Sequence, residues 1–284
     1  MWHRNFRVGN VGVTVGSTLT SCTAILEPLC RLYTDSTDAP TLLHFRIEPR
    51  DGQIHLSINE ETLWQGTDAG EIAAGFEVHL YQRLLAALLP DFLSLHAGCV
   101  ELGGQACLFA AASGAGKSSL TTAAVLDGAN YLSDEFALLG SDGRISPFPR
   151  PLQWGKLRHP AFRHVQMLHS GKCSKALFRF PDRYGRTVTT LLWLPAMIRH
   201  APLPLGIVVL PQYMRRAPAA EMAPIRRGEA LMELPRHLHH RLPPEIMLQA
   251  LNRRIPATTR FYRLQFSDAR TAWRTIRDLP ETTT

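Results

Sequence analysis

Residues Ser94–Gly140 read SLHAGCVELGGQACLFAAASGAGKSSLTTAAVLDGANYLSDEFALLG, and the rest of the fold is organised around this stretch. At its centre lies a run of small residues that ends in a lysine and two serines. Small residues let backbone N–H groups turn toward phosphate oxygens, and the helix that follows directs its positive N-terminus at the same oxygens. The pattern therefore predicts a phosphate-binding loop, formed by Ser113, Gly114, Ala115, Gly116, Lys117, Ser118 and Ser119.

The residues on either side of the loop predict the strand and the helix that such a loop needs. Ala106–Ala110 is a short apolar run typical of a strand. After the loop, apolar residues recur at helical spacing until Gly128, where we expect the helix to end. One position departs from the Walker pattern, because Ala111 stands where a glycine is expected, five residues before Gly116.

The composition favours a globular protein that binds anionic ligands. The chain has 284 residues, 45% of them hydrophobic, which is enough to bury a substantial core in one or two domains. It carries 31 lysines and arginines against 24 acidic residues, for a net charge of +7. These charges are scattered, without a basic tract that alternates with aromatic residues, so we expect no nucleic-acid partner.

Cysteine usage and hydropathy predict the compartment. An odd cysteine count, without close pairs at metal-ligand spacing, favours a reducing environment. The N-terminal residues MWHRNFRVGN lack the apolar core of a signal peptide, and no stretch is long and apolar enough to cross a bilayer. We therefore expect a cytoplasmic protein with no membrane partner, in which Cys99 and Cys107 pack as small hydrophobic residues within strands.

Residues 1–90 predict a β-rich region that ends in a helix. Two apolar runs flank Asp51-Gly52, a pair typical of a hairpin turn, and a third short strand follows them. From Ala69 to Leu89, apolar residues recur at every fourth position, which predicts a helix that the next residue, a proline, ends. In the first part of this region, up to about residue 38, only the alternation at Val11–Val15 indicates a strand.

Residues 91–284 predict strands on both sides of the loop and its helix. Leu93–Leu102 alternates as a strand and turns at two glycines into the strand before the loop. After the loop helix, we expect one continuous strand over Tyr131–Leu139, followed by a hairpin turn at Asp142-Gly143. An antiparallel hairpin at this place argues against an ordinary doubly wound sheet, where a crossover helix would follow.

The remaining segments have signals of different strength. Pro149–Pro204 is rich in proline, arginine and histidine with weak periodicity, so we expect irregular loops there. The segments with clearer patterns predict a buried strand, two short helices, another strand and a final helix capped by Ser267 or Asp268. In the same order, these segments are Leu205–Leu210, Glu229–His239, Pro244–Arg253, Phe261–Phe266 and the residues up to Leu279.

With these elements in place, the chain resembles the kinase domain of HPr kinase/phosphorylase. It is more similar still to the HPr-kinase-related proteins encoded with modified-peptide clusters, such as those of lasso peptides. The resemblance rests on His96-Ala97, the loop SGAGKSS and the segment LSDEFALL, in that order. The family implies an α/β fold shared with ATP-dependent phosphoenolpyruvate carboxykinase. The mixed-sheet P-loop kinase core would span residues 91–284, preceded by the small β-rich region.

The resemblance also implies an activity and roles for particular residues. It implies that ATP and Mg²⁺ are the cofactors and that phosphate is transferred to a serine hydroxyl of a peptide or protein. Lys117 would neutralise the β/γ-phosphates, Asp134 would accept the hydroxyl proton, and His96 would lie beside it. Ser118 and Glu135 would bind Mg²⁺. The family's usual Asp-Asp pair is Asp-Glu here, and its Arg-Gly-x-Gly signature is missing, so HPr is not the expected substrate.

Two further groups of residues are candidates for the site. Arg150, Arg183 and Arg186 are suited to holding phosphate or an acceptor peptide, because a guanidinium binds phosphate through two hydrogen bonds. A group of histidines occurs near the end of a predicted helix, without a cysteine or carboxylate nearby to complete a metal site. For these histidines, which are His237, His239 and His240, we expect a solvated helix end.

Three functions stay open on the sequence alone. They are a serine kinase of peptides or proteins, a kinase of a small hydroxylated metabolite, and a nucleotide-binding regulatory subunit without transfer activity. A GTPase is disfavoured, because the chain has no Asn/Thr-Lys-x-Asp motif for guanine. The net charge of +7 and the resemblance favour a peptide acceptor in a groove edged by arginines of Pro149–Pro204. A homo-oligomer is compatible with this sequence.

Overall fold

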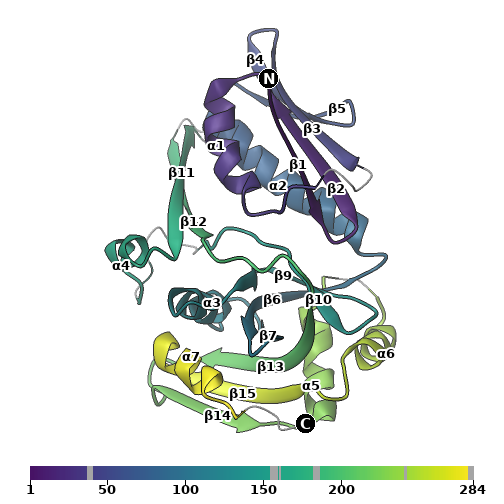
Figure 1. The fold of residues 1–284 in the computed structure, drawn as a ribbon, viewed down its shortest axis with the longest axis vertical. Coiled ribbons are helices and arrows are strands. Elements are labelled where there is room, and N and C mark those ends of the chain that lie inside the picture. The colour runs from purple at the N-terminus through teal and green to yellow at the C-terminus, as the bar shows by residue number, and fades with distance from the viewer. Residues whose placement is uncertain (37–40, 154–158, 160, 182–185, 240–241, 281–284) are drawn as a thin grey trace. The chain divides into compact units, whose positions relative to one another are not determined.

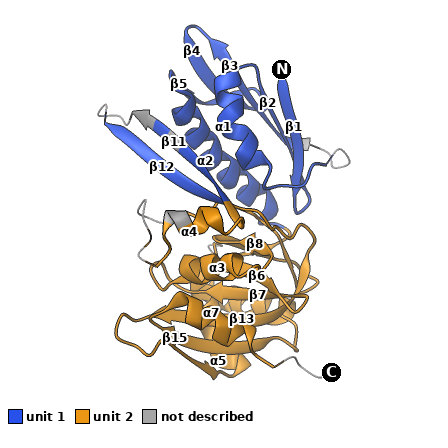
Figure 2. Ribbon diagram, turned by 60° about the vertical axis from the view of Figure 1, so that its left-hand side comes forward, with its two compact units in different colours: residues 1–90, 174–194 blue, residues 91–173, 195–284 orange. Residues whose placement is uncertain are grey.

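The protein is an α/β protein with mixed sheets and a small β-rich N-terminal region (Figure 1). A computed structural model describes it over residues 1–36, 41–153, 159, 161–181, 186–239 and 242–280. The chain folds into two compact units (Figure 2). The first consists of residues 1–90 and 174–194, and the second of residues 91–173 and 195–284. The sequence analysis had placed residues 174–194 in the second region.

The first unit contains a five-stranded sheet in which the strands follow their order in the chain. Only the pairing of β2 with β3 is parallel. The predicted hairpin is confirmed, since Asp51 and Gly52 both have positive φ, of 50° and 74°. The sequence analysis missed β1 and the first helix, α1. The strands are β1 (Trp2–Val8), β2 (Val11–Ser17), β3 (Thr41–Arg50), β4 (Gln53–Ile58) and β5 (Glu61–Gly66), and α1 is Thr20–Cys30.

The predicted long helix is α2, Ala69–Leu88. Asp68 caps its N-terminus, where the carboxylate accepts hydrogen bonds from the backbone N–H groups of Gly70 and Glu71. The apolar residues at period four are all buried, and this stripe holds the helix against the sheet of the first unit. They are Ile72, Phe76, Leu80, Leu84 and Leu88.

The expectation of irregular loops between Pro149 and Pro204 is wrong. The segment contains a short helix, α4 (His164–His169), and a two-stranded sheet of β11 (Cys173–Pro181) with β12 (Thr187–Pro195). Most described residues of β11 are exposed, and β12 ends in a continuous buried run, so the alternation that marks a half-buried strand is weak in the sequence of the hairpin. Within the first unit the hairpin lies alongside α2 (Figure 2). A Cβ on Gly70 would come within 2.6 Å of the Arg179 carbonyl oxygen.

The second unit contains an eight-stranded mixed sheet in the order β10-β9-β6-β7-β13-β15-β14, with β8 also paired to β6. Strands β7, β13 and β15 are parallel to one another, and the pairs around them are antiparallel. The mixed sheet that the resemblance implied is therefore present. The strands are β6 (Leu93–Leu102), β7 (Gln105–Ala110), β8 (Tyr131–Ser133), β9 (Phe136–Leu139), β10 (Arg144–Ser146), β13 (Leu203–Tyr213), β14 (Ala220–Pro224) and β15 (Arg260–Phe266).

Helices cover both faces of this sheet (Figure 1). Residues of β6 that point to opposite faces of the sheet contact different helices. Leu95 packs in the same core cluster as Leu231 of the second helical layer, whereas Gly98 lies against Thr121 of the loop helix. The predicted helix over Glu229–His239 is shorter and ends in a 3₁₀ turn that includes Pro235. One face carries α3 (Lys117–Leu126) and α7 (Ala269–Arg277), and the other α5 (Arg227–Glu233), the 3₁₀ turn η1 (Leu234–His237) and α6 (Pro244–Arg254).

The structure also bears on the cysteines and on membrane association. All five thiols are buried and free, and Cys99 and Cys107 lie in β6 and β7 as expected. Burial raises the pKa of both thiols, so they stay protonated and pack as small apolar groups.

None of the helices in the described part of the chain is long and apolar enough to cross a membrane.

Candidate functional site

The predicted loop joins the end of β7 to the start of α3. Gly114 and Gly116 have φ angles of 81° and 98°, in the left-handed region that glycine enters without a steric cost. Ala111 has no positive φ, so this departure from the Walker pattern causes no backbone strain. Because Gly116 directly precedes α3, the unpaired N–H groups of the first helical turn point into the loop.

Lys117 is buried at the centre of the loop. Its Nζ donates hydrogen bonds to the carbonyl oxygens of Ala111 and Ala112, at 2.8 and 3.1 Å. Burial lowers the pKa of the ammonium group, and the charges of Glu135 and Asp134 oppose this effect. The lysine therefore holds its charge beside the backbone that would surround a bound phosphate.

The strand predicted over Tyr131–Leu139 is broken at its two carboxylates. The chain leaves the sheet after β8 and returns with β9, so that Asp134 and Glu135 lie in a bend between the two strands. The Ser133 hydroxyl stabilises the bend, because it accepts hydrogen bonds from the N–H groups of Glu135 and Phe136. The break releases both side chains from the alternation of a strand, which would have directed them to opposite faces.

Asp134 is buried against the loop helix. The hydroxyl groups of Ser118 and Thr121 interact with its carboxylate, and its Oδ1 is a buried atom without a hydrogen-bond partner among the described residues. Burial raises the pKa of Asp134 to about 7, although the two hydroxyls act to lower it. Gly98 of β6 makes this packing possible, since a Cβ there would come within 2.2 Å of the Thr121 hydroxyl oxygen.

Glu135 has a different environment from its neighbour. Its Oε1 lies 2.7 Å from His96 Nδ1, and its Oε2 lies 3.8 Å from a guanidinium nitrogen of Arg150. Burial alone would raise the pKa of Glu135, but the hydrogen bond and charge of His96, together with Arg150, lower it below its usual value. Two adjacent carboxylates therefore differ in protonation near neutral pH, and such a difference is typical of acid–base sites.

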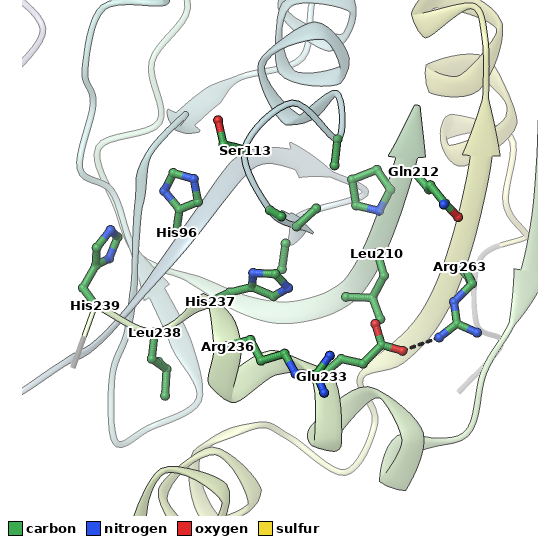
Figure 3. A pocket seen from close by; sticks show the side chains of 15 residues that line it. His96, Ser113, Leu210, Gln212, Glu233, Arg236, His237, Leu238, His239 and Arg263 are labelled. Carbon is green, nitrogen blue, oxygen red and sulfur yellow. Dashed lines mark hydrogen bonds and ion pairs between the residues drawn. The ribbon is translucent and has the colours of Figure 1, made fainter. Parts of the chain in front are cut away.

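A cavity of about 690 Å³ opens at the carboxyl ends of β7 and β13, beside the loop (Figure 3). This volume lies within the range of small-molecule sites. Ligands of α/β sheets usually bind at this edge. One wall is the loop and the ends of the two strands, and the other wall is formed around η1 and by Arg263 of β15. The lining residues are His96, Ala110, Ala111, Ala112, Ser113, Ala115, Leu210, Pro211, Gln212, Glu233, Arg236, His237, Leu238, His239 and Arg263.

The predicted loop residues do not all face this cavity. Ser113 and Ala115 line it, and Lys117 is hydrogen-bonded to the carbonyl oxygens of Ala111 and Ala112, which also line it. The hydroxyl of Ser119 is 2.8 Å from Nε2 of His159, a contact that anchors the loop helix to the segment after Pro149. The structure thus brings together the loop, Lys117 and both predicted carboxylates.

The arginines at the cavity are not those expected. Arg150 lies beside Glu135 but does not line the cavity, Arg186 belongs to the first unit, and Arg183 lies outside the described residues. The guanidinium groups on the cavity wall come instead from Arg236 and Arg263. Nothing in the local sequence singles out these two positions, because they reach the site through the pairing of β15 with β13 and through the position of η1.

The expectation of a solvated helix end for the histidines is also wrong for the residues described. His237 is half-buried on the cavity wall, and burial lowers its pKa. His239 lies beside His96 and Glu135. The carboxylate that the neighbouring sequence did not offer to these histidines therefore comes from a distant part of the chain. His240 lies outside the described residues.

No protein-family model matches the chain, and no curated protein sequence matches it.

Proposed function

We propose that the protein is an ATP-dependent serine kinase with a P-loop kinase core, which transfers the γ-phosphate of ATP to a hydroxyl of a peptide or protein. The observation that carries the proposal is the position of Asp134. This carboxylate is buried beside Ser118 of the loop, in an environment that raises its pKa to about 7. A phosphate-binding loop alone would serve any nucleotide-binding protein, whereas a proton acceptor tuned to neutral pH is suited to transfer.

The loop supplies the binding of ATP. Its backbone N–H groups and the N-terminus of α3 are suited to the phosphate oxygens, and Lys117 adds a fixed positive charge. The oxygen donors required for Mg²⁺ are also present, since Ser118 offers a hydroxyl and Glu135 a carboxylate with a lowered pKa. These two residues would hold the ion, which would neutralise charge on the phosphates.

Asp134 supplies the proton acceptor. The oxygen of the acceptor hydroxyl forms a bond to the γ-phosphorus, and the bond from that phosphorus to the β–γ bridging oxygen breaks. The proton of the hydroxyl passes to Asp134, and ADP is the leaving group. The buried Oδ1 of Asp134, which has no hydrogen-bond partner among the described residues, supports this role.

The charge of the cavity supports an anionic or extended acceptor. Arg236 faces the loop across the cavity (Figure 3), Arg263 also lines it, and the whole chain carries a net charge of +7. An extended peptide can present a serine to such an open cavity, and a precursor peptide encoded beside the gene is the first candidate. A folded protein would require a docking surface in addition.

The proposal is tested by incubating the protein, ATP and Mg²⁺ with a short peptide encoded next to its gene. Mass spectrometry should find one added phosphate on the peptide, and none when its serine is changed to alanine. Asp134→Asn keeps the shape but removes the base, so transfer should fall by roughly 10²–10⁴ while ATP still binds. Glu135→Gln keeps Asp134 and leaves an amide oxygen that can still coordinate Mg²⁺, so its effect on transfer should be milder.

The matched control is Asp51→Asn, which makes the same chemical change in an exposed hairpin turn of the first unit and should leave transfer intact. Transfer to a free metabolite alone would favour a metabolite kinase. Binding of ATP without transfer to any acceptor would favour a regulatory subunit. Loss of transfer in Glu135→Gln but not in Asp134→Asn would reverse the roles of the two carboxylates.

A further inference from the structure

Three metal-binding side chains converge at one end of the cavity from separate parts of the second unit. His96 comes from β6, Glu135 from the break between β8 and β9, and His239 from the residues just after η1. One ligand atom from each residue lies within 4.8 Å of those of the other two. The two imidazoles lie edge to face at the same end of the cavity, with ring centroids 5.7 Å apart (Figure 3), and all three side chains are half-buried.

The contacts around His239 resemble those that orient a metal-binding histidine. Its Nδ1 lies 3.0 Å from the Ser94 hydroxyl oxygen, and its backbone N–H donates to the Ser94 carbonyl oxygen at 2.9 Å. A hydrogen bond at one ring nitrogen fixes the tautomer and directs the other nitrogen to a metal. A further bridge between Leu95 and Leu238 holds this segment against β6, so the position of His239 is set by backbone as well as by side-chain contacts.

We propose that His96, Glu135 and His239 form a binding site for a divalent first-row transition metal, with Zn²⁺ or Co²⁺ as the fitting ions. Two imidazoles and one carboxylate are the ligand set of several catalytic zinc sites, which keep a fourth position open. Imidazole favours these ions, whereas Mg²⁺ prefers oxygen ligands only. The two imidazoles distinguish this site from the oxygen site that Ser118 and Glu135 would form for Mg²⁺, and the two sites share the Glu135 carboxylate.

The distances between the ligands are compatible with this ion. Two ligands of a tetrahedral zinc with bonds of about 2.1 Å lie roughly 3.4 Å apart, so movements of about 1 Å per side chain would suffice. His96 and Glu135, which pair directly at 2.7 Å, would have to separate slightly to admit the ion. Since His96 and His239 both line the cavity, the open position would face it and could take a water or a ligand oxygen.

This inference shares Glu135 with the proposed kinase, but it does not require ATP, an acceptor or transfer. The experiment therefore uses the metal alone. The full chain, freed of metal with a chelator, is titrated with Co²⁺ and with Zn²⁺ in the absence of nucleotide. Calorimetry gives the affinity, and the visible absorption of Co²⁺ reports whether its coordination is tetrahedral.

We expect one ion per chain with micromolar or tighter affinity and an intense tetrahedral cobalt spectrum. His239→Ala should weaken binding by at least about 100-fold and remove the spectrum. Ser94→Ala, which leaves all three ligands in place, should weaken it by roughly 10–100-fold. The matched control is His169→Ala, an exposed histidine on α4 that is not part of the cluster and should change neither readout.

Binding that is equally strong in His239→Ala would overturn the proposal, as would the absence of a tetrahedral spectrum in the wild-type protein. Circular dichroism establishes that each variant is folded, and His239→Gln, which keeps a polar side chain of similar length, replaces the alanine variant if that one does not fold. A kinase that transfers phosphate but binds no Co²⁺ or Zn²⁺ would refute this inference alone. A protein that binds the metal but never transfers phosphate would refute only the proposed function.

Discussion

The two walls of the cavity are built in different ways. The loop wall comes largely from one continuous segment, Ala110–Ala115, and presents mainly backbone groups and the start of a helix. The opposite wall combines Glu233–His239 with Arg263 of β15, and presents guanidinium and imidazole groups. Backbone groups are fixed by the conformation of the chain, whereas side chains can be replaced one at a time. Under the proposed function, the loop wall would set the affinity for phosphate and the opposite wall would select the acceptor.

The largest effect is expected from the loop wall. Lys117→Ala removes the buried ammonium group that donates to the loop carbonyls, so ATP should bind more weakly by about 2–4 kcal/mol. Titration calorimetry with ATP and Mg²⁺ measures the change. Lys175→Ala, an exposed lysine of the first unit, is the matched control. Equal affinity in the Lys117→Ala variant and the wild type would remove the loop from the proposed site.

The two walls also differ in how well they could be predicted from the sequence. The position and backbone conformation of the loop could be predicted, because Gly114, Gly116 and Lys117 act through local conformation and short-range spacing, although only Ser113 and Ala115 of the predicted residues line the wall. The opposite wall could not be predicted, because Arg236 and Arg263 are brought to the cavity by the packing of segments that follow a long stretch of weak periodicity. Local patterns carry no information on such contacts.

The arrangement of the two carboxylates, Asp134 and Glu135, could be predicted only in part. The alternation of side chains along a strand gave the reason why Asp134 and Glu135 could not both face one site without a distortion. The form of that distortion depends on the Ser133 hydroxyl and on the pairing of both β8 and β9 with β6. The position of His239 beside Glu135 was missed for a similar reason, since the two residues are more than a hundred positions apart in the chain.

A smaller effect concerns the stability of the loop wall and its dependence on pH. Burial raises the pKa of Asp134 from 3.8 to about 7, so the folded state favours the protonated carboxyl. Its contribution to stability is complete below pH 4 and is lost as the pH rises through about 7. Asp134→Asn carries no charge, so at pH 8 it should be more stable than the wild type by on the order of 1–3 kcal/mol.

Thermal melts of the two proteins at pH 5 and pH 8 measure this difference. Each kcal/mol corresponds to about 2–4 °C for a unit of this size. The advantage of Asp134→Asn should shrink toward pH 5, where the wild-type carboxyl is mostly protonated. A variant that is less stable by the same amount at both pH values would mean that the Ser118 and Thr121 hydroxyls hold the carboxylate as a stable ion.

The smallest effect is expected from the opposite wall. Arg236 lines the cavity and is exposed, so its interaction with an acceptor is weakened by solvent and should contribute about 1 kcal/mol. Arg236→Ala should therefore raise the KM for the peptide about fivefold while the affinity for ATP stays unchanged. Arg236→Lys keeps the charge but loses the planar fork of donors, so its KM should fall between the two. Arg253→Ala, an exposed arginine on α6, is the control. A loss of ATP affinity in Arg236→Ala, without a change in the KM for the peptide, would place the opposite wall in the nucleotide site. The two walls would then not have the separate roles proposed for them.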